Sequence, residues 1–147
     1  TLEIFKMMKD QGIGLCPTLA AGDAITQYRG WNKVTDPEPE RIQQKRKSFK
    51  MALDSGVQIV FGGDVGVFTH GENYREMELM VDYGMKPLAV LKSATSDNAN
   101  MFHLNQLGKL KEGFLADIIA VKGNPVKDIT NVKNVSFVMK DGLIYKE

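Results

Sequence analysis

The sequence predicts an α/β fold in which parallel strands are covered by helices, either in a layer or as part of a barrel. Over the first 61 residues, apolar residues follow the order helix, strand, helix, strand, and this order favours parallel strands. From Gly108 onward the pattern changes to short strands separated by turn residues. The last forty or so residues are therefore predicted to form a β segment in a different layer.

The N-terminal region is predicted to contain one helix and one strand. Apolar residues three apart predict a helix over residues 1–11, and Gly12 follows where a helix would end. Residues 13–19 are mostly apolar and are predicted to form a buried strand that closes in Cys-Pro-Thr-Leu. The polar stretch 22–39 is predicted to be a long connection that covers a site, because neutral linkers of this length are uncommon in compact domains.

A second helix is predicted from Glu38 to Gly56, because Ile42, Phe49 and Leu53 lie on one stripe. Five basic residues occupy the rest of its surface: Arg41, Lys45, Arg46, Lys47 and Lys50. We interpret them as a solvated face rather than as a binding patch, because surface helices normally carry such charge.

The next segments repeat the alternation of strand and helix. The run 57–61, apolar except for Gln58, is predicted to be a strand buried on both faces. After a loop over 62–73, one helix is predicted to end at Gly84, and another to begin at Pro87 and run toward His103.

The C-terminal region is predicted to contain three strands, over 115–121, 135–139 and 143–145. The last two flank Lys140, Asp141 and Gly142, which form a hairpin signal.

Composition narrows the classes of partner. The 19 basic and 18 acidic residues leave a formal net charge of +1. We therefore expect a small-molecule partner, and we do not expect nucleic acid or a membrane surface.

A single cysteine, Cys16, allows no internal disulfide. No stretch approaches the ~20 apolar residues of a membrane-spanning helix. The chain starts at Thr1 without a signal-peptide pattern, and we expect it to begin inside a longer coding sequence. The cellular compartment is not indicated.

Asp64 directly follows the predicted strand 57–61, at the end where α/β folds place their chemistry. Gly62, Gly63 and Gly66 around it would let the backbone turn sharply and let a ligand come close. From spacing alone, Asp64 fits a catalytic role and a cap of the next helix equally well.

The run 62–66, followed by His70-Gly71-x-Asn73 and Glu76, resembles the eighth-strand segment of the amidohydrolase superfamily. The most similar branch contains the imidazolonepropionase-related and Xaa-Pro dipeptidase (prolidase)-like enzymes. Five further segments follow that family's C-terminal pattern in order: 84–91, 94–99, 108–113, 116–121 and 139–142. The resemblance spans essentially the whole chain.

The resemblance implies the C-terminal portion of a (β/α)8 TIM-type barrel plus the C-terminal strands of a small β-sandwich. Residues 1–104 would form the last strands and helices of the hydrolase barrel, and residues 105–147 the C-terminal part of the β domain. The implied activity is hydrolysis of C–N bonds in a small peptide, amide or cyclic amide, of a dipeptidase- or carboxypeptidase-like kind.

The resemblance also implies one or two divalent metal ions, usually zinc, at the barrel mouth. Asp64 would bind metal with one carboxylate oxygen and hold the attacking water with the other, which makes it the catalytic residue and a metal ligand. A bound divalent cation lowers the pKa of water toward neutrality, and a nearby carboxylate can accept the proton. His70 and Asn73 would contact substrate carbonyl or carboxylate groups. Without the resemblance, His70 would be interpreted as a surface or loop-fixing residue.

Three other positions are interpreted from their local setting. Glu72 and Glu76 fit acids stabilised at a helix N-terminus. Gly63 stands where the family usually has Thr or Ser, so a hydroxyl is missing there. His103 stands where a helix-ending glycine is usual, which affects only the local geometry.

Most of the family's metal ligands have no counterpart in this sequence. A complete barrel takes ~250 residues, and the chain has only two histidines. We therefore expect Asp64 to hold an ion weakly and the isolated chain to be inactive. Unpaired strand edges predict self-association or pairing with a missing N-terminal segment. Alternatives are a deaminase or lactonase on the same fold, or a non-catalytic binding or structural module.

Overall fold

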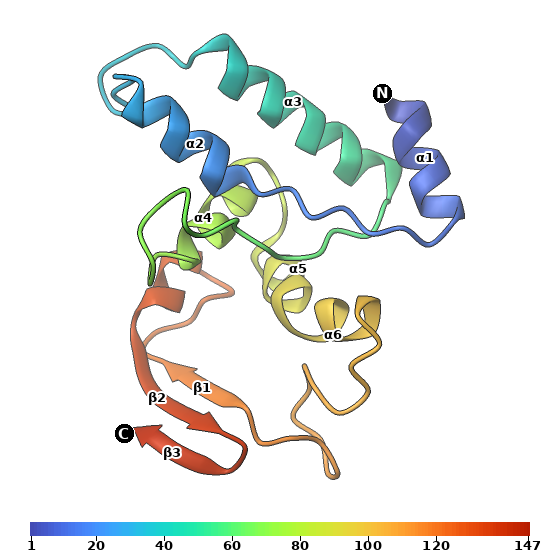
Figure 1. The fold of residues 1–147 in the computed structure, drawn as a ribbon, viewed down its shortest axis with the longest axis vertical. Helices are drawn as coiled ribbons and strands as arrows, with labels where there is room; N and C mark the ends of the chain where they lie inside the picture. Colours follow the sequence, from blue (N-terminus) through green and yellow to red (C-terminus); the bar gives the residue numbers. More distant parts are fainter. The chain divides into compact units, whose positions relative to one another are not determined.

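The computed structural model describes all residues, 1–147, and divides into two compact units, Thr1–Met85 and Lys86–Glu147 (Figure 1). The first unit is mainly helical, and the second combines a helical segment with a small sheet. None of the helices is both long and apolar enough to cross a membrane.

The first unit contains four helices: α1 (Leu2–Asp10), α2 (Leu19–Tyr28), α3 (Glu40–Ser55) and α4 (Tyr74–Asp82). Helix α1 packs on α3, and α2 packs on both α3 and α4. The side chains at the centre of this packing are almost fully buried: Leu19, Ile42, Phe49, Leu79 and Met80. Three helices were predicted from their apolar stripes, and the structure confirms all three to within a few residues.

Two extended segments run side by side beneath these helices (Figure 1). Leu15 and Ile59 form a parallel bridge between them, which confirms the predicted direction of the strands 13–19 and 57–61. Neither predicted strand extends beyond this single bridge. The first was predicted too long, because Leu19 already belongs to α2. Pro17 has no N–H to donate, and Thr18 turns into the left-handed region at φ 44°, so the ladder cannot continue. The second was predicted to be buried on both faces, which is wrong because Gln58 is exposed.

Helix α2 corrects the prediction that residues 22–39 form a connection throughout. Seven of its ten residues are buried, so it lacks the polar face that makes a surface helix recognisable. Its first half is rich in alanine, which has the highest helix propensity. The pattern around Gly22 therefore looked like a loop although the segment is a buried helix.

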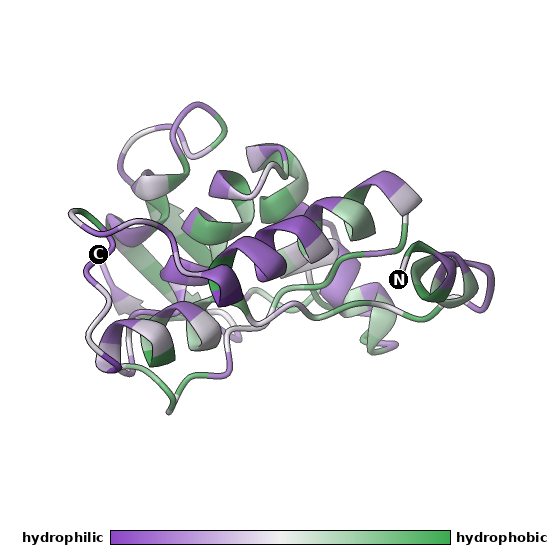
Figure 2. Ribbon diagram, turned by 90° about the horizontal axis from the view of Figure 1, so that it is seen from above, coloured by the Kyte–Doolittle hydropathy of each residue, from purple (hydrophilic) through white to green (hydrophobic).

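Helix α3 is hydrophilic along much of its length (Figure 2). Arg41, Lys47 and Lys50 are exposed, which confirms the solvated face for these three. The interpretation was wrong for Lys45 and Arg46, which are half-buried and bind other segments. Because both side chains are long, they reach from the edge of α3 to carbonyl groups of other segments.

The helical segment of the second unit begins at Pro87, as predicted. It consists of α5 (Pro87–Lys92), a π-helical turn over Ser93–Asp97 and α6 (Asn98–Met101). His103 follows with a left-handed φ of 56°, the conformation that a glycine would adopt most easily. The difference at this position from the family pattern is therefore confined to local geometry, as predicted.

The sheet of the second unit has three antiparallel strands in the order β1-β2-β3. They are β1 (Ile118–Val121), β2 (Val135–Lys140) and β3 (Leu143–Lys146), with a 3₁₀ helix over Ile129–Lys133 before β2. All three strands were predicted, although β1 starts three residues later. Asp141 and Gly142 have φ values of 51° and 78°, which is typical of a type I′ turn and confirms the hairpin.

Candidate active site

The candidate site lies where two parallel segments end at the same edge. The Leu15 N–H donates to the Gln58 carbonyl oxygen at 2.8 Å, and the Val60 N–H donates to the Leu15 carbonyl oxygen at 3.0 Å. Because the two segments are parallel, their carboxyl ends point the same way. The turn at Cys16–Thr18 and the loop at Gly62–Asp64 therefore leave the bridge in the same direction.

Asp64 is exposed and has a left-handed φ of 56°. Asp is one of the few residue types with a side chain that adopts this conformation readily. The next helix, α4, does not begin until Tyr74, so Asp64 is not a helix cap. The position just after the bridged segment 57–61 and the unusual backbone are both typical of functional residues.

Thr18 has the same kind of backbone at the end of the other segment, with φ 44° and ψ 51°. This conformation is rare for a β-branched residue and costs on the order of 1–3 kcal/mol. Thr18 was not among the predicted site residues. No local signal would have singled it out, because Thr after Pro ordinarily favours an extended backbone.

Glu76 connects the two ends, although it lies on α4. Its carboxylate accepts hydrogen bonds from the Leu19 N–H at 2.9 Å and the Ala20 N–H at 2.6 Å, and its side chain is fully buried. Glu76 lies in the first turn of α4, which confirms its interpretation as an acid at a helix N-terminus, and its carboxylate also binds the first N–H groups of α2. Leu19 and Ala20 are 57 and 56 positions away from Glu76 in the sequence, so only the folded chain brings these groups together.

Burial raises the pKa of Glu76 from 4.5 to about 6. The N–H groups of Ala20 and Leu19 and the ammonium group of Lys45 act in the opposite direction. Desolvation thus outweighs the favourable contacts of the charged form. Glu72 has a different partner, since its carboxylate forms an ion pair with Arg75 at 3.2 Å.

Cys16 lies against the loop that carries Asp64. Its thiol donates to the Gly62 carbonyl oxygen at 3.6 Å. Burial raises the pKa of the thiol, the charges of Glu76 and Asp64 raise it further, and the Thr18 N–H lowers it. A direct contact between the ends of the two segments is the bond from the Cys16 thiol to the Gly62 carbonyl oxygen.

Gly63 is packed closely against other side chains, which gives a physical reason why this position lacks the Thr or Ser hydroxyl that is usual in the family. A Cβ atom at this position would lie 3.2 Å from the Phe68 Cζ atom and 3.7 Å from the Glu76 Cβ atom. Phe68 is almost fully buried and occupies the space that a larger residue at position 63 would need.

His70 and Asn73 belong to the loop that follows Asp64. His70 and Asn73 are both exposed. Asn73 precedes α4 without a hydrogen bond from its side chain to the helix. The loop thus brings Asp64, His70 and Asn73 into one segment, and their contacts with substrate remain a prediction.

No group of three or more His, Cys, Asp and Glu side chains in the chain could hold a metal ion. Asp64 offers one carboxylate, whereas a zinc site in an enzyme normally has three protein ligands. The donor set of this chain by itself does not fit a metal ion.

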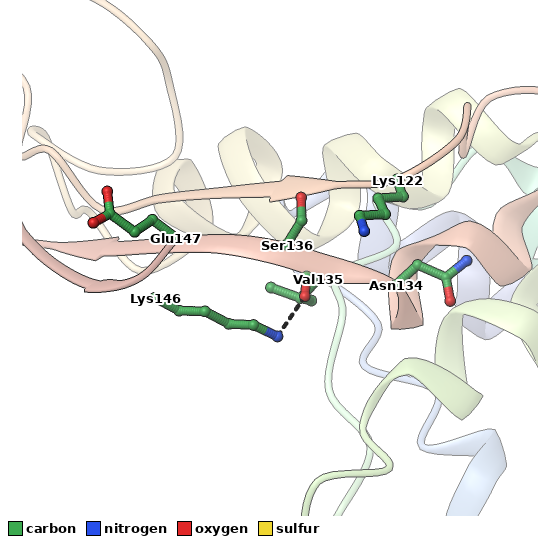
Figure 3. A pocket seen from close by; sticks show the side chains of 6 residues that line it. All are labelled: Lys122, Asn134, Val135, Ser136, Lys146 and Glu147. Atoms are coloured by element: carbon green, nitrogen blue, oxygen red, sulfur yellow. Dashed lines mark hydrogen bonds between the residues drawn. The ribbon is translucent and has the colours of Figure 1, made fainter.

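A pocket of about 560 Å³ lies on the sheet of the second unit (Figure 3). Its lining is largely polar: Lys122, Asn134, Val135, Ser136, Lys146 and Glu147. The Lys146 ammonium group donates to the Val135 carbonyl oxygen at 2.6 Å. None of the three predicted site residues lines this pocket, so it is not part of the candidate site.

Comparisons with known proteins give a consistent result. The sequence model of the amidohydrolase family matches residues 3–144. Ochratoxinase from Aspergillus niger is 30% identical over 158 residues, an alignment that covers 98% of this chain and 32% of the ochratoxinase. This chain therefore spans about a third of the length of the curated relative.

Solved structures agree with the sequence comparison. A Xaa-Pro dipeptidase with methionine bound in its active site has a TM-score of 0.86 and 36% identity, covering 100% of this chain and 38% of the dipeptidase. A prolidase in complex with N-methylphosphonate-L-proline has a TM-score of 0.75 and 29% identity, covering 100% of this chain and 38% of the prolidase.

Proposed function

Since this chain belongs to the amidohydrolase family, we propose that it carries Asp64 as the catalytic and metal-binding carboxylate of an enzyme that hydrolyses C–N bonds in amides or peptides. The position of Asp64 carries this proposal: it is exposed, has a left-handed backbone and lies just after the segment 57–61 that forms the parallel bridge. The names of the related ochratoxinase, dipeptidase and prolidase support an amide or peptide substrate, of a dipeptidase- or carboxypeptidase-like kind.

Asp64 would act on the water that attacks the substrate carbonyl. A divalent ion such as zinc, when bound, would supply a water of lowered pKa. The Asp64 carboxylate would accept a proton from the attacking water and later deliver it to the leaving amine. The loop after Asp64 would present His70 and Asn73 to carbonyl or carboxylate groups of the substrate.

The remaining metal ligands would come from outside this chain. With one carboxylate available, we expect the isolated chain to bind divalent ions weakly and to be inactive. In the complete enzyme, residues 1–104 would belong to a TIM-type barrel and residues 105–147 to a small β-sandwich. A single bridge between Leu15 and Ile59 joins the two segments, and we expect a further strand of the same protein or of a second copy to pair beside them.

The proposal is tested in the protein that carries this chain, with an Asp64→Asn variant. Hydrolysis of a panel of N-acyl amino acids and Xaa-Pro dipeptides is measured together with zinc content after dialysis. We expect Asp64→Asn to lower kcat by a factor on the order of 10³ or more, because it removes the proton acceptor, and to lower zinc content.

Asp10→Asn is the matched control, since Asp10 is also an exposed aspartate but ends α1. It should leave both quantities unchanged. Retention of full activity and full zinc content by Asp64→Asn would refute the proposal. Release of ammonia from an amidine substrate, with no amide cleavage, would instead favour the deaminase alternative.

A further inference from the structure

The strained backbone of Thr18 needs an external support. Its own side chain makes no capping hydrogen bond to α2, so the hydroxyl does not stabilise the turn in the usual way of an N-cap residue. A left-handed conformation at a β-branched residue persists only where surrounding groups impose it. The contacts on either side of Thr18 therefore decide its conformation.

Both flanks of Thr18 are held by side chains from other helices. On the N-terminal side, the Lys45 ammonium group donates to the Pro17 carbonyl oxygen at 3.1 Å. On the C-terminal side, the buried Glu76 carboxylate accepts from the N–H groups of Leu19 and Ala20. Glu76 thus takes the place of the N-cap side chain and anchors the first turn of α2, which immediately follows Thr18.

The same Glu76 side chain also lies behind the loop of Asp64. A Cβ atom on Gly63, the residue before Asp64, would be 3.7 Å from the Glu76 Cβ atom. Glu76 therefore contacts one strand end through its carboxylate and lies against the other through its Cβ atom. A displacement of this side chain would move the turn at Thr18 and the loop at Asp64 relative to each other.

From these contacts we infer that Glu76 is a positioning residue of the candidate active site, which holds Thr18 left-handed and thereby keeps the turn after the first strand in place beside the Asp64 loop. The inference rests on the proposed function of Asp64, and it adds a residue that does not itself touch the substrate. It predicts that Glu76 and Thr18 are energetically coupled in catalysis.

The coupling is measured by a double-mutant cycle in the protein that carries this chain. Glu76→Gln keeps the size of the side chain but offers one acceptor oxygen in place of two. We expect it to lower kcat/KM on the order of ten-fold or more, mainly through kcat, because small misplacements near reacting groups are costly. In a Thr18→Gly background the same change should cost about three-fold or less, because glycine adopts the left-handed conformation without support.

Thr18→Ala is the matched control, because alanine lacks the hydroxyl but still disfavours the left-handed region. The effect of Glu76→Gln should remain large in that background. Glu76→Asp provides a second variant if Glu76→Gln fails to fold, since its shorter carboxylate can keep one of the two bonds. Glu76→Asp should lower kcat/KM less than Glu76→Gln does, and the Thr18→Gly background should reduce that loss as well.

Two results would overturn the inference while leaving the proposed function intact. One is wild-type kcat/KM in both Glu76 variants, with Asp64→Asn still inactive. The other is an equal effect of Glu76→Gln in the wild-type, Thr18→Gly and Thr18→Ala backgrounds, which would indicate general structural support. Failure of the proposed function is recognised separately, by full activity of Asp64→Asn.

Discussion

The Cys16 thiol donates a hydrogen bond to the Gly62 carbonyl oxygen at 3.6 Å and thereby joins the ends of the two parallel segments. The two residues are 46 positions apart and touch so closely that a side chain at position 62 has no room. A Cβ atom there would lie 2.6 Å from the Cys16 Sγ atom, well inside the ordinary contact distance. This packing leads to a first prediction about stability.

Gly62→Ala is expected to lower the free energy of unfolding by about 1–3 kcal/mol, the usual cost of overpacking. Urea denaturation of the chain, followed by circular dichroism, measures the change. The Cys16→Ala background supplies the control, because it removes the Sγ atom that the new methyl group would meet. An undiminished cost in that background would show that the contact with Cys16 is not the cause.

Gly22→Ala is expected to raise the free energy of unfolding, the opposite of Gly62→Ala. Gly22 lies inside α2, and a Cβ atom there would meet only the Lys45 Cε atom, at an ordinary distance of 3.7 Å. Alanine in a helix interior is favoured over glycine by roughly 0.5–1 kcal/mol. The same denaturation experiment should show this gain. A loss of stability would mean that the packing of α2 on α3 is tighter than the distance indicates.

Stability is expected to depend on pH through Glu76. Its pKa is about 6 in the folded chain and 4.5 without burial, so the folded state binds more protons between these values. The free energy of unfolding should therefore fall as pH rises from about 4.5 to 6, by roughly 2 kcal/mol at most. Aspartates with a lowered pKa, such as Asp117 and Asp128, act in the opposite direction. Their contribution to the free energy of unfolding rises with pH, in a lower pH range than that of Glu76.

Glu76→Gln removes this titration, and the variant should lose the fall in stability over the same pH range. The measurement is the midpoint of urea denaturation at pH steps between about 4 and 7, on either side of the titration. A wild-type chain whose stability rises steadily across this range, with the same slope in the variant, would contradict the assignment of the raised pKa to Glu76.

Arg46 is expected to stabilise the packing of α3 on the end of α4. Its guanidinium group pairs with Glu38 at 2.9 Å and with Asp82 at 3.0 Å, and it lies 4.1 Å from the ring centroid of Tyr83. It also donates to the Asp82 carbonyl oxygen at 2.8 Å. Burial raises the pKa of the Tyr83 hydroxyl to about 12, so the ring stays neutral at physiological pH.

Arg46→Ala should therefore cost about 1–2 kcal/mol, most of it from the ring contact and the carbonyl bond, because partly exposed ion pairs add little. Lys50→Ala on the same helix is the control. Lys50 pairs with Asp54, and both side chains are mostly exposed, so its loss should cost less than about 0.5 kcal/mol. Equal costs for the two substitutions would show that the contacts of Arg46 are no stronger than a surface pair.

The elements that the sequence predicted are those whose signal is local. Helix α3 has an apolar stripe on a polar background, and the segment 57–61 is apolar except for Gln58. The hairpin at Asp141 and Gly142 needs two left-handed residues in succession, which this pair supplies. The place of Asp64 after the bridged segment 57–61 could likewise be predicted, because the segment and the loop that follows it are adjacent in the chain.

The elements that were missed depend on contacts between distant residues. Helix α2 is buried on nearly all sides, so the polar residues that reveal a helical period are absent. The partners of Lys45 lie outside α3, and nothing in the spacing of its charges distinguishes it from its exposed neighbours. Thr18 looked like an ordinary residue at the end of a strand, because its conformation is imposed from elsewhere.

By itself, the sequence determined the order of most helices and strands, their apolar faces and the place of Asp64 at a strand end. Only the tertiary structure decided that Glu76 anchors α2, that Thr18 is left-handed and that Cys16 lies against Gly62. The physical reason is that a periodic pattern records which face of an element is buried. It does not record which distant group will occupy that buried space or accept a hydrogen bond there.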